Sequence, residues 1–193
     1  MNIENQGLFA KLKEQTMECD LCRLRFSCKQ VVFGRGNPEA KIFFVGEGPG
    51  AQEDEQGLPF VGKSGKLLDK IISTAGLKPE EIYIANVVKC RPPDNRIPLA
   101  DEVTACKPYL LKQIGLIAPL IVVTLGAAAT QALIDRKAKI TKVRGVYTEI
   151  DGLKFMPTFH PAALLRDPSK KPLVIEDIEK VRDYYLKWKS TQE

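Results

Sequence analysis

The sequence is poor in histidine and tryptophan, with one of each among 193 residues, and it contains no long hydrophobic run. No apolar stretch approaches the roughly 20 residues that a membrane-spanning helix needs. The N-terminal residues MNIENQGLFAKLKEQ lack the basic start and the apolar segment of a secretory signal. We therefore expect a cytoplasmic protein whose five cysteines are reduced thiols rather than disulfides.

The composition is close to the globular average, with 44% hydrophobic and 27% charged residues, which excludes wholesale disorder. A chain of this length can bury a substantial core, and we expect a single domain over residues 1–193. Lysine and arginine outnumber aspartate and glutamate by 29 to 24, for a net charge of +5. This modest excess suits a polyanion such as nucleic acid but does not establish one.

The cysteines predict a metal site. Cys19 and Cys22 form a C-x-x-C motif within the polar stretch ECDLCRLRFSC, whose charged residues are not typical of a core. Cys90 and Cys106 follow far downstream, so four thiolates are available as ligands. Zinc and iron–sulfur clusters both accept four thiolates, and the spacing alone does not choose between them.

The hydrophobic pattern alternates between strands and helices. Short apolar runs predict buried parallel strands at 41–46, 82–88 and 120–125, and a weaker one at 155–159. Apolar residues at helical spacing predict helices over 8–18, 64–75, 101–117, 127–134 and 173–189, with Asp101 as an N-cap. The pattern predicts an α/β fold with three α/β/α layers and a central, mostly parallel four-stranded sheet.

The polar residues that could carry chemistry stand at the ends of these strands. Ligands of parallel sheets bind beyond the carboxyl ends of the strands, so the loops beginning at Gly46, Asn86, Gly126 and His160 should converge. A buried Asn amide costs stability unless it has a partner. Together with Phe60 from the glycine-rich loop, Asn86 and His160 could stack on, read and polarise a planar heterocycle.

Residues 57–64 match the phosphate-loop pattern G-x-x-x-x-G-K-S letter for letter. A true phosphate loop directly follows its strand and exposes backbone N–H groups. Here the nearest strand ends about ten residues earlier, Pro59 removes a donor, and Phe60 is bulky. We therefore reject a nucleotide hydrolase, although Lys63 and Ser64 at a helix start remain candidates for holding a phosphate.

Several motifs occur together in a familiar order. They are Gly46-Glu-Gly-Pro-Gly50, Glu53-Asp54, Gly57-Leu-Pro-Phe-Val-Gly62, Asn86-Val-Val-Lys-Cys-Arg-Pro-Pro93 and His160-Pro-Ala-Ala-Leu-Leu-Arg166. The chain resembles the family 4 uracil-DNA glycosylases of the uracil-DNA glycosylase superfamily, the type that carries a [4Fe–4S] cluster. The resemblance spans roughly residues 19–166.

This resemblance implies an enzyme that swings uracil out of DNA and hydrolyses its N-glycosidic bond, leaving an abasic site. Phe60 would stack on the base, Asn86 would pair with its N3–H and O4, and His160 would donate a hydrogen bond to O2 as charge builds there. The residues implied to line the base pocket are Glu47, Gly48, Pro49, Glu53, Phe60, Asn86 and His160, with Glu53 against the C5 edge. Glu47 ranks ahead of Asn95 for activating water, because Gly48 stands where another glycosylase family has a carboxylate.

The resemblance also implies a DNA-binding face. Leu164, Leu165 and Arg166 match the wedge that fills the gap left by the extruded base, although these residues could simply start a helix. The candidates for phosphate contacts are Lys63, Ser64, Lys89, Arg91, Arg96, Lys170 and Lys171.

The family's cluster ligands map onto Cys19, Cys22, Cys90 and Cys106, which leaves Cys28 as a spare thiol. We expect a structural [4Fe–4S] cluster that clamps the N-terminal segment to residues 90–98 and takes no redox part in catalysis.

Two other functions remain open: a non-catalytic, metal-bound DNA-binding module, and a related glycosylase with a broader range of deaminated bases. A covalent-trapping relative is disfavoured, because its basic loop ends in histidine and this chain has no second one. We expect a monomer acting on single- or double-stranded DNA, and no sequence feature identifies a replication-clamp contact.

Overall fold

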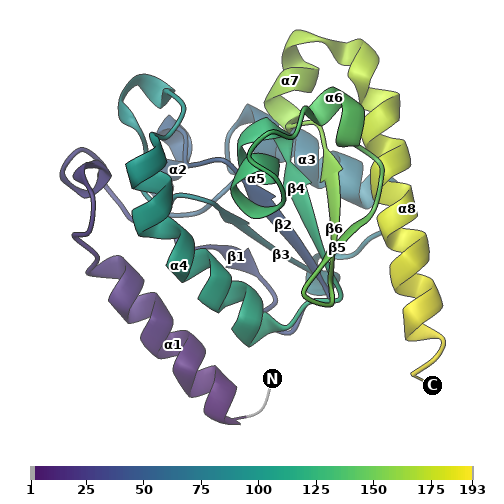
Figure 1. The fold of residues 1–193 in the computed structure, drawn as a ribbon, viewed down its shortest axis with the longest axis horizontal. Coiled ribbons are helices and arrows are strands. Elements are labelled where there is room, and N and C mark those ends of the chain that lie inside the picture. The colour runs from purple at the N-terminus through teal and green to yellow at the C-terminus, as the bar shows by residue number, and fades with distance from the viewer. Residues whose placement is uncertain (1–2, 193) are drawn as a thin grey trace.

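The computed structural model describes residues 3–192, whose strands form one sheet in the order β1-β3-β2-β4-β6-β5 (Figure 1). These strands are β1 (Arg35–Gly36), β2 (Ile42–Gly46), β3 (Ile82–Asn86), β4 (Ile121–Leu125), β5 (Thr148–Ile150) and β6 (Leu153–Thr158). β2, β3, β4 and β6 run parallel, whereas β1 and β5 pair antiparallel at the two edges. The α/β class is confirmed, but the expected four-stranded sheet is wrong and is replaced by a six-stranded mixed sheet.

The two edge strands were missed because they are short and partly exposed, so neither forms a continuous apolar run. The parallel strands, in contrast, are apolar because both faces of the sheet are covered. Along β2, Ile42 and Phe44 join the core on one face, and Phe43 and Val45 join the core on the other.

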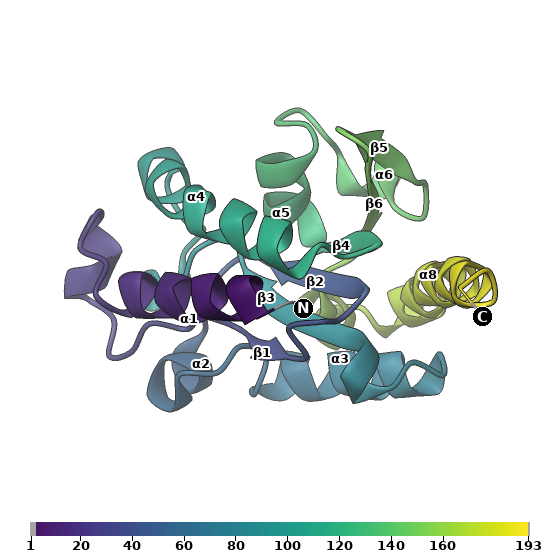
Figure 2. The same ribbon diagram turned by 90° about the horizontal axis from the view of Figure 1, so that it is seen from below.

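Helices cover both faces of the sheet, with α4 and α5 on one side and α3 on the other (Figure 2). The first core contains residues of α3 (Lys63–Thr74), α7 (Pro161–Arg166) and α8 (Lys171–Lys189). The second core contains residues of α4 (Ala100–Ile117) and α5 (Gly126–Leu133), and Phe9 of α1 (Ile3–Met17) packs against it. No helix among the described residues has both the length and the apolar character needed to traverse a lipid bilayer.

The expected helices all form, although α1 begins earlier than expected. The expected N-cap at Asp101 is wrong, because α4 begins after Leu99 and the carboxylate of Glu102 accepts a hydrogen bond from the Leu99 backbone N–H. Three short helices are not among those expected: α2 (Ala51–Gln56), α6 (Ile140–Val143) and α7. The 3-10 turns are η1 (Arg23–Phe26), η2 (Pro79–Glu81), η3 (Pro93–Asn95) and η4 (Pro168–Lys170).

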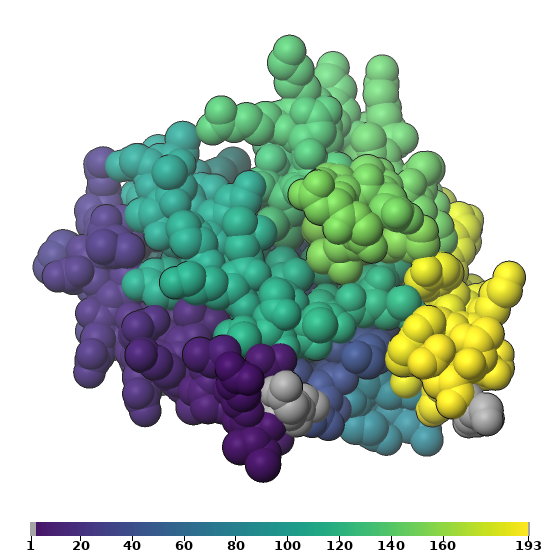
Figure 3. Space-filling model, turned by 60° about the horizontal axis from the view of Figure 1, so that its bottom comes forward, coloured from purple at the N-terminus to yellow at the C-terminus, as the bar shows by residue number. Residues whose placement is uncertain are grey.

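The carboxyl ends of the parallel strands meet at one edge of the sheet. Gly46 pairs with Asn86, and Leu125 pairs with Thr158. β2 lies between β3 and β4, so the strands that follow it are added on one side of β2 and then on the other. In doubly wound sheets, a crevice for ligands opens at the point where the strand order reverses in this way. α1, α4 and α8 cover much of the side of the molecule brought forward in Figure 3.

Candidate active site

A cavity of about 700 Å³ lies at the carboxyl edge of the sheet. All seven residues expected to line a base pocket border it: Glu47, Gly48, Pro49, Glu53, Phe60, Asn86 and His160. Gly126 and Ala127, which follow β4, complete the convergence of the four strand ends. The volume is within the range of small-molecule sites.

Asn86 ends β3 and lies at the cavity with only 2% of its surface exposed. Among the described residues, its Oδ1 is the buried side-chain polar atom that has no hydrogen-bond partner. A methyl group on Gly46 would lie 2.5 Å from both this oxygen and the Phe60 ring, so only glycine fits between them. An unpaired buried amide oxygen costs about 1–3 kcal/mol, which is offset when a ligand donates to it.

Phe60 has a left-handed backbone conformation, with φ of 55°, which is unfavourable for a bulky residue. The surrounding backbone holds it there. Arg35 Nε donates to the Pro59 carbonyl at 2.9 Å, and Gly65 packs so closely that a Cβ would lie 1.9 Å from the Phe60 carbonyl oxygen. The Phe60 and His160 rings are 5.7 Å apart between centroids, so both aromatic groups face the same cavity.

Glu53 stabilises this turn. Its Oε1 accepts hydrogen bonds from the backbone N–H groups of Val61 at 2.9 Å and Gly62 at 2.8 Å, and its Oε2 accepts one from Gly50. The carboxylate thereby joins the start of α2 to the loop that carries Phe60. Its expected place against the C5 edge of a base stays a prediction, and its role in holding the loop had not been foreseen.

His160 is held as a neutral imidazole of defined tautomer. Burial chiefly, together with the nearby positive charge of Arg166, lowers the pKa of His160 to about 4. The backbone N–H of Ala162 donates to Nδ1 at 3.1 Å, so this nitrogen is the acceptor and the ring proton resides on Nε2. The site therefore offers an N–H donor that carries no positive charge at neutral pH.

Glu47 borders the cavity directly after β2, and burial raises the pKa of its carboxyl group. Asn95 also borders the cavity, but its Oδ1 accepts a hydrogen bond from Arg91 Nε at 2.9 Å. Both candidates for activating water thus lie at the cavity, and the role of either one stays a prediction.

The expected DNA-contact residues divide into two groups. Ser64, Arg96 and Arg166 border the cavity, whereas Lys63, Arg91, Leu164, Leu165, Lys170 and Lys171 do not. Leu164 is only 3% exposed and belongs to the core, so Leu165, at 51%, is the side chain free to act as a wedge.

The expectation that Lys89 contacts a phosphate is wrong, because its side chain is buried. Its Nζ donates to the Asn86 carbonyl at 3.0 Å and to Gln113 Oε1 at 2.5 Å. Burial lowers the pKa of Lys89 to about 8. Its backbone N–H also donates to Cys106 Sγ at 3.2 Å, so Lys89 connects a candidate metal ligand to the strand end that bears Asn86.

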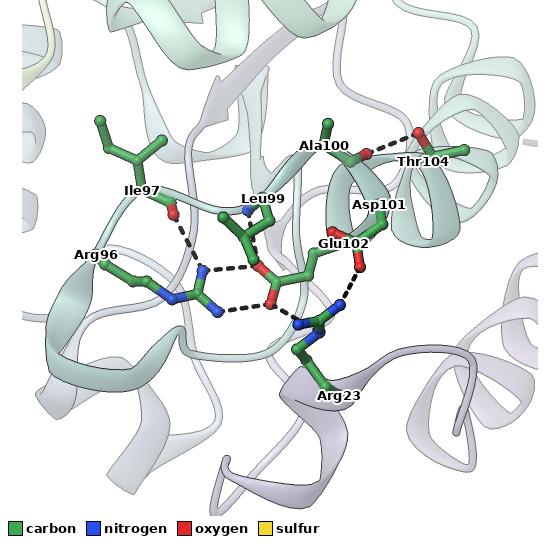
Figure 4. Close-up of polar contacts among 8 residues, drawn as sticks. All are labelled: Arg23, Arg96, Ile97, Leu99, Ala100, Asp101, Glu102 and Thr104. Atoms are coloured by element: carbon green, nitrogen blue, oxygen red, sulfur yellow. Dashed lines mark hydrogen bonds and ion pairs between the residues drawn. The ribbon is translucent and has the colours of Figure 1, made fainter.

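Arg96 is also less available than expected. Its guanidinium forms two hydrogen bonds, at 2.6 and 2.8 Å, with the fully buried carboxylate of Glu102 (Figure 4). Arg23 of η1 pairs with Asp101 at 2.5 Å and approaches Glu102 at 3.9 Å. Glu102 thus fixes the cavity-lining loop to α4, and the N-terminal segment lies beside the same carboxylate.

The four cysteines of the predicted metal site border one small cavity lined mainly by apolar side chains. Among residues 3–192, no group of three or more potential ligands is placed to hold a single metal ion. Cys19, Cys22, Cys90 and Cys106 nevertheless offer four thiols around one shared space, which is the donor set that an iron–sulfur cluster takes. Cys28 lies outside this cavity, and a hydrogen bond with Cys90 lowers the pKa of the Cys28 thiol.

Similarity to known proteins extends over most of the chain. Residues 33–182 match the model of the uracil DNA glycosylase superfamily. A type-4 uracil-DNA glycosylase of Thermotoga maritima is 46% identical, over 94% of this chain and 97% of the relative. Type-4 enzymes of Sulfurisphaera tokodaii and Saccharolobus solfataricus are 45% and 44% identical, over 90% and 94% of this chain and 83% and 87% of theirs. The chain belongs to the type-4 uracil-DNA glycosylases of the uracil DNA glycosylase superfamily.

Proposed function

We propose that this protein removes uracil from DNA by hydrolysing the N-glycosidic bond, leaving an abasic site. The membership in the type-4 family supports this activity. The observation that carries the proposal is the unpartnered Asn86 Oδ1 at a cavity that also presents an aromatic ring and a neutral imidazole.

Base selection follows from the amide of Asn86. Its Oδ1 accepts a hydrogen bond from uracil N3–H, and its Nδ2 donates to O4. Cytosine has an acceptor at N3 and a donor at N4, so the same amide orientation would place like groups together. Phe60 stacks on the extruded ring, which contributes about 1–3 kcal/mol.

The bond between C1′ and N1 breaks with its electron pair moving onto the base, and negative charge builds on O2. The Nε2–H of His160 donates to that oxygen, and one such donor typically lowers the barrier by about 3–4 kcal/mol. A water molecule oriented by Glu47 adds to C1′ and releases a proton, and the departing uracil anion is protonated in turn.

Cys19, Cys22, Cys90 and Cys106 would hold a [4Fe–4S] cluster. Bound there, the cluster supplies cross-linking rather than a step of the hydrolysis. These thiols lie on the N-terminal segment, the loop after β3 and α4, so a shared cluster would fix the cavity-lining loop from a second side. Purified protein should be brown and contain about four iron atoms per chain.

DNA lies across the mouth of the cavity. The side chain of Leu165 fills the gap that the extruded base leaves in the base stack. Lys63, Ser64, Arg91 and Lys171 are the remaining phosphate candidates of the resemblance, and Arg166 stays a part of the proposed wedge. Lys63 begins α3 and is exposed, which supports a backbone contact near the helix N-terminus.

The test is an excision assay on oligonucleotides that differ only in carrying uracil, thymine, cytosine or hypoxanthine. Uracil alone should be released. Asn86→Leu should abolish excision without destabilising the fold, because leucine fills a similar volume and the buried oxygen has no protein partner to lose. Gln15→Leu, at an exposed amide on α1 that does not border the cavity, is the control.

Release of hypoxanthine would favour the broader-range glycosylase instead. Binding of the uracil strand without any release would favour the non-catalytic module. Full activity of Asn86→Leu would overturn the assignment of base reading to this amide.

A further inference from the structure

A row of unpaired cations lies on the segment between α5 and β5. We name Arg136, Lys137, Lys139 and Lys142 the basic ridge. All four side chains are exposed, and within the described part of the chain no carboxylate lies at ion-pair distance from any of them. Long side chains of this green segment project from the upper edge of the molecule in Figure 3.

The basic ridge is a fixed part of the structure. Gln131 Nε2 donates to the Ala138 carbonyl at 3.0 Å, and Ala138 itself is buried. Beyond α6, Arg144 forms a two-bond ion pair with the fully buried Asp177 of α8. These contacts hold both ends of the ridge against the body of the protein.

The segment that carries the basic ridge also reaches the cavity. Ile140 of α6 and Gln131 of α5 line the cavity wall. The backbone N–H of Gly145 donates to the Pro157 carbonyl of β6 at 2.9 Å, three residues before His160. The ridge is therefore joined to the strand that positions the catalytic imidazole, on the wall formed by α5 and α6.

Two of the cations expected to contact phosphate are already neutralised. Arg96 pairs with Glu102 at 2.6 Å, and Lys170 pairs with Asp167 at 3.0 Å. On the ridge, the adjacent Asp135 accepts instead from the backbone N–H of Lys137. Four like charges in one short stretch repel each other unless an anion lies over them.

We infer that the basic ridge binds backbone phosphates of the DNA strand flanking the extruded nucleotide. This inference rests on the proposed function and extends it, because none of the four residues belongs to the motifs of the resemblance. The ridge adds a second line of phosphate contacts on the α5–α6 wall of the cavity, away from Lys63 and Arg91.

The test compares two variants with the same net charge. The ridge variant carries Arg136→Gln, Lys137→Gln, Lys139→Gln and Lys142→Gln. The control variant carries Lys11→Gln, Lys13→Gln, Lys112→Gln and Lys187→Gln, all exposed positions on α1, α4 and α8. Binding to a fluorescent duplex containing 2′-fluoro-2′-deoxyuridine, which resists excision, is measured between 50 and 300 mM salt, about the range over which counterion release is resolved.

The ridge variant should weaken binding at low salt and reduce the slope of log K against log salt by about 0.9 for every phosphate that it no longer neutralises. Its single-turnover excision rate at saturating enzyme should stay near that of the wild type, since no ridge residue lines the cavity. The control variant should change the slope much less.

Equal slopes for the two variants would overturn the inference, because the effect would then come from net charge alone. Failure of the wild-type protein to excise uracil would instead overturn the proposed function, and the binding slopes would still report on the ridge.

Discussion

The single histidine makes the protonation state of the active site directly measurable. With 15N-labelled histidine, the imidazole signals in an NMR spectrum come from His160 alone. They should show the neutral Nε2–H tautomer from pH 8 down to about 5. Because burial lowers the pKa of His160 to about 4, the ring should titrate far below the ordinary value of about 6.5. Excision should accordingly show no loss between pH 7.5 and 5.5 that is due to this group.

The same shift affects the free energy of unfolding. Below pH 6.5 the unfolded chain takes up a proton on this imidazole that the folded chain refuses, so stability is lost as the pH falls from 6.5 toward 4. A difference of about 2.5 pH units corresponds to about 3 kcal/mol once the pH is below both pKa values. Above pH 6.5 the group contributes no pH dependence.

His160→Asn isolates this contribution. Asparagine can still accept from the Ala162 N–H at the start of α7, so the helix keeps its N-cap. Denaturant unfolding of both proteins at pH 7.5, 6 and 5 should show the wild type losing stability more steeply, while all other acid-sensitive groups cancel in the difference. Parallel loss in the two proteins, or an imidazole midpoint near 6.5, would refute the buried neutral state.

Three further changes separate the roles assigned above. Gly46→Ala should lower kcat/KM at least tenfold at little cost in expression, since its methyl group would displace the base-reading amide or the stacking ring by steric contact; excision kinetics test this, and unchanged kinetics would contradict it. Glu102→Gln should lower the free energy of unfolding by about 2 kcal/mol, because the Arg96 guanidinium loses its charged acceptor; urea unfolding at pH 7 measures it, with Asp101→Asn as the exposed control. Leu165→Ala should slow excision from duplex more than from single strands at unchanged stability, whereas Leu164→Ala should cost about 2–5 kcal/mol of stability; equal effects of the two changes on unfolding would remove the distinction.

The parallel strands and the residues at their carboxyl ends could be predicted from the sequence, whereas the two edge strands could not. Strands buried on both faces must be apolar at every position, so β2, β3 and β4 stand out as short hydrophobic runs. Asn86 ends β3 and His160 follows β6, so both polar residues are conspicuous after an apolar run, and the parallel topology brings these strand ends together.

The supporting contacts could not be predicted in the same way. Glu53 and Glu102 each stand three residues after the residue that precedes their helix, a spacing typical of N-terminal capping. The spacing could have suggested a cap, but the further bonds to Val61, Gly62 and Arg96 depend on loops folded from elsewhere. Lys89 was assigned to the surface because lysine is usually exposed, and its partner Gln113 lies on α4, far along the chain.

Lys89 has one more consequence, which concerns damage. Its backbone N–H donates a hydrogen bond to Cys106 Sγ, and its ammonium group donates to the backbone carbonyl of Asn86, whose amide is proposed to read uracil. Oxidative loss of iron from the proposed cluster would disturb Lys89 through its contact with Cys106. The disturbance would reach Asn86 through the Lys89 ammonium group, so base discrimination would be lost before the sheet unfolds.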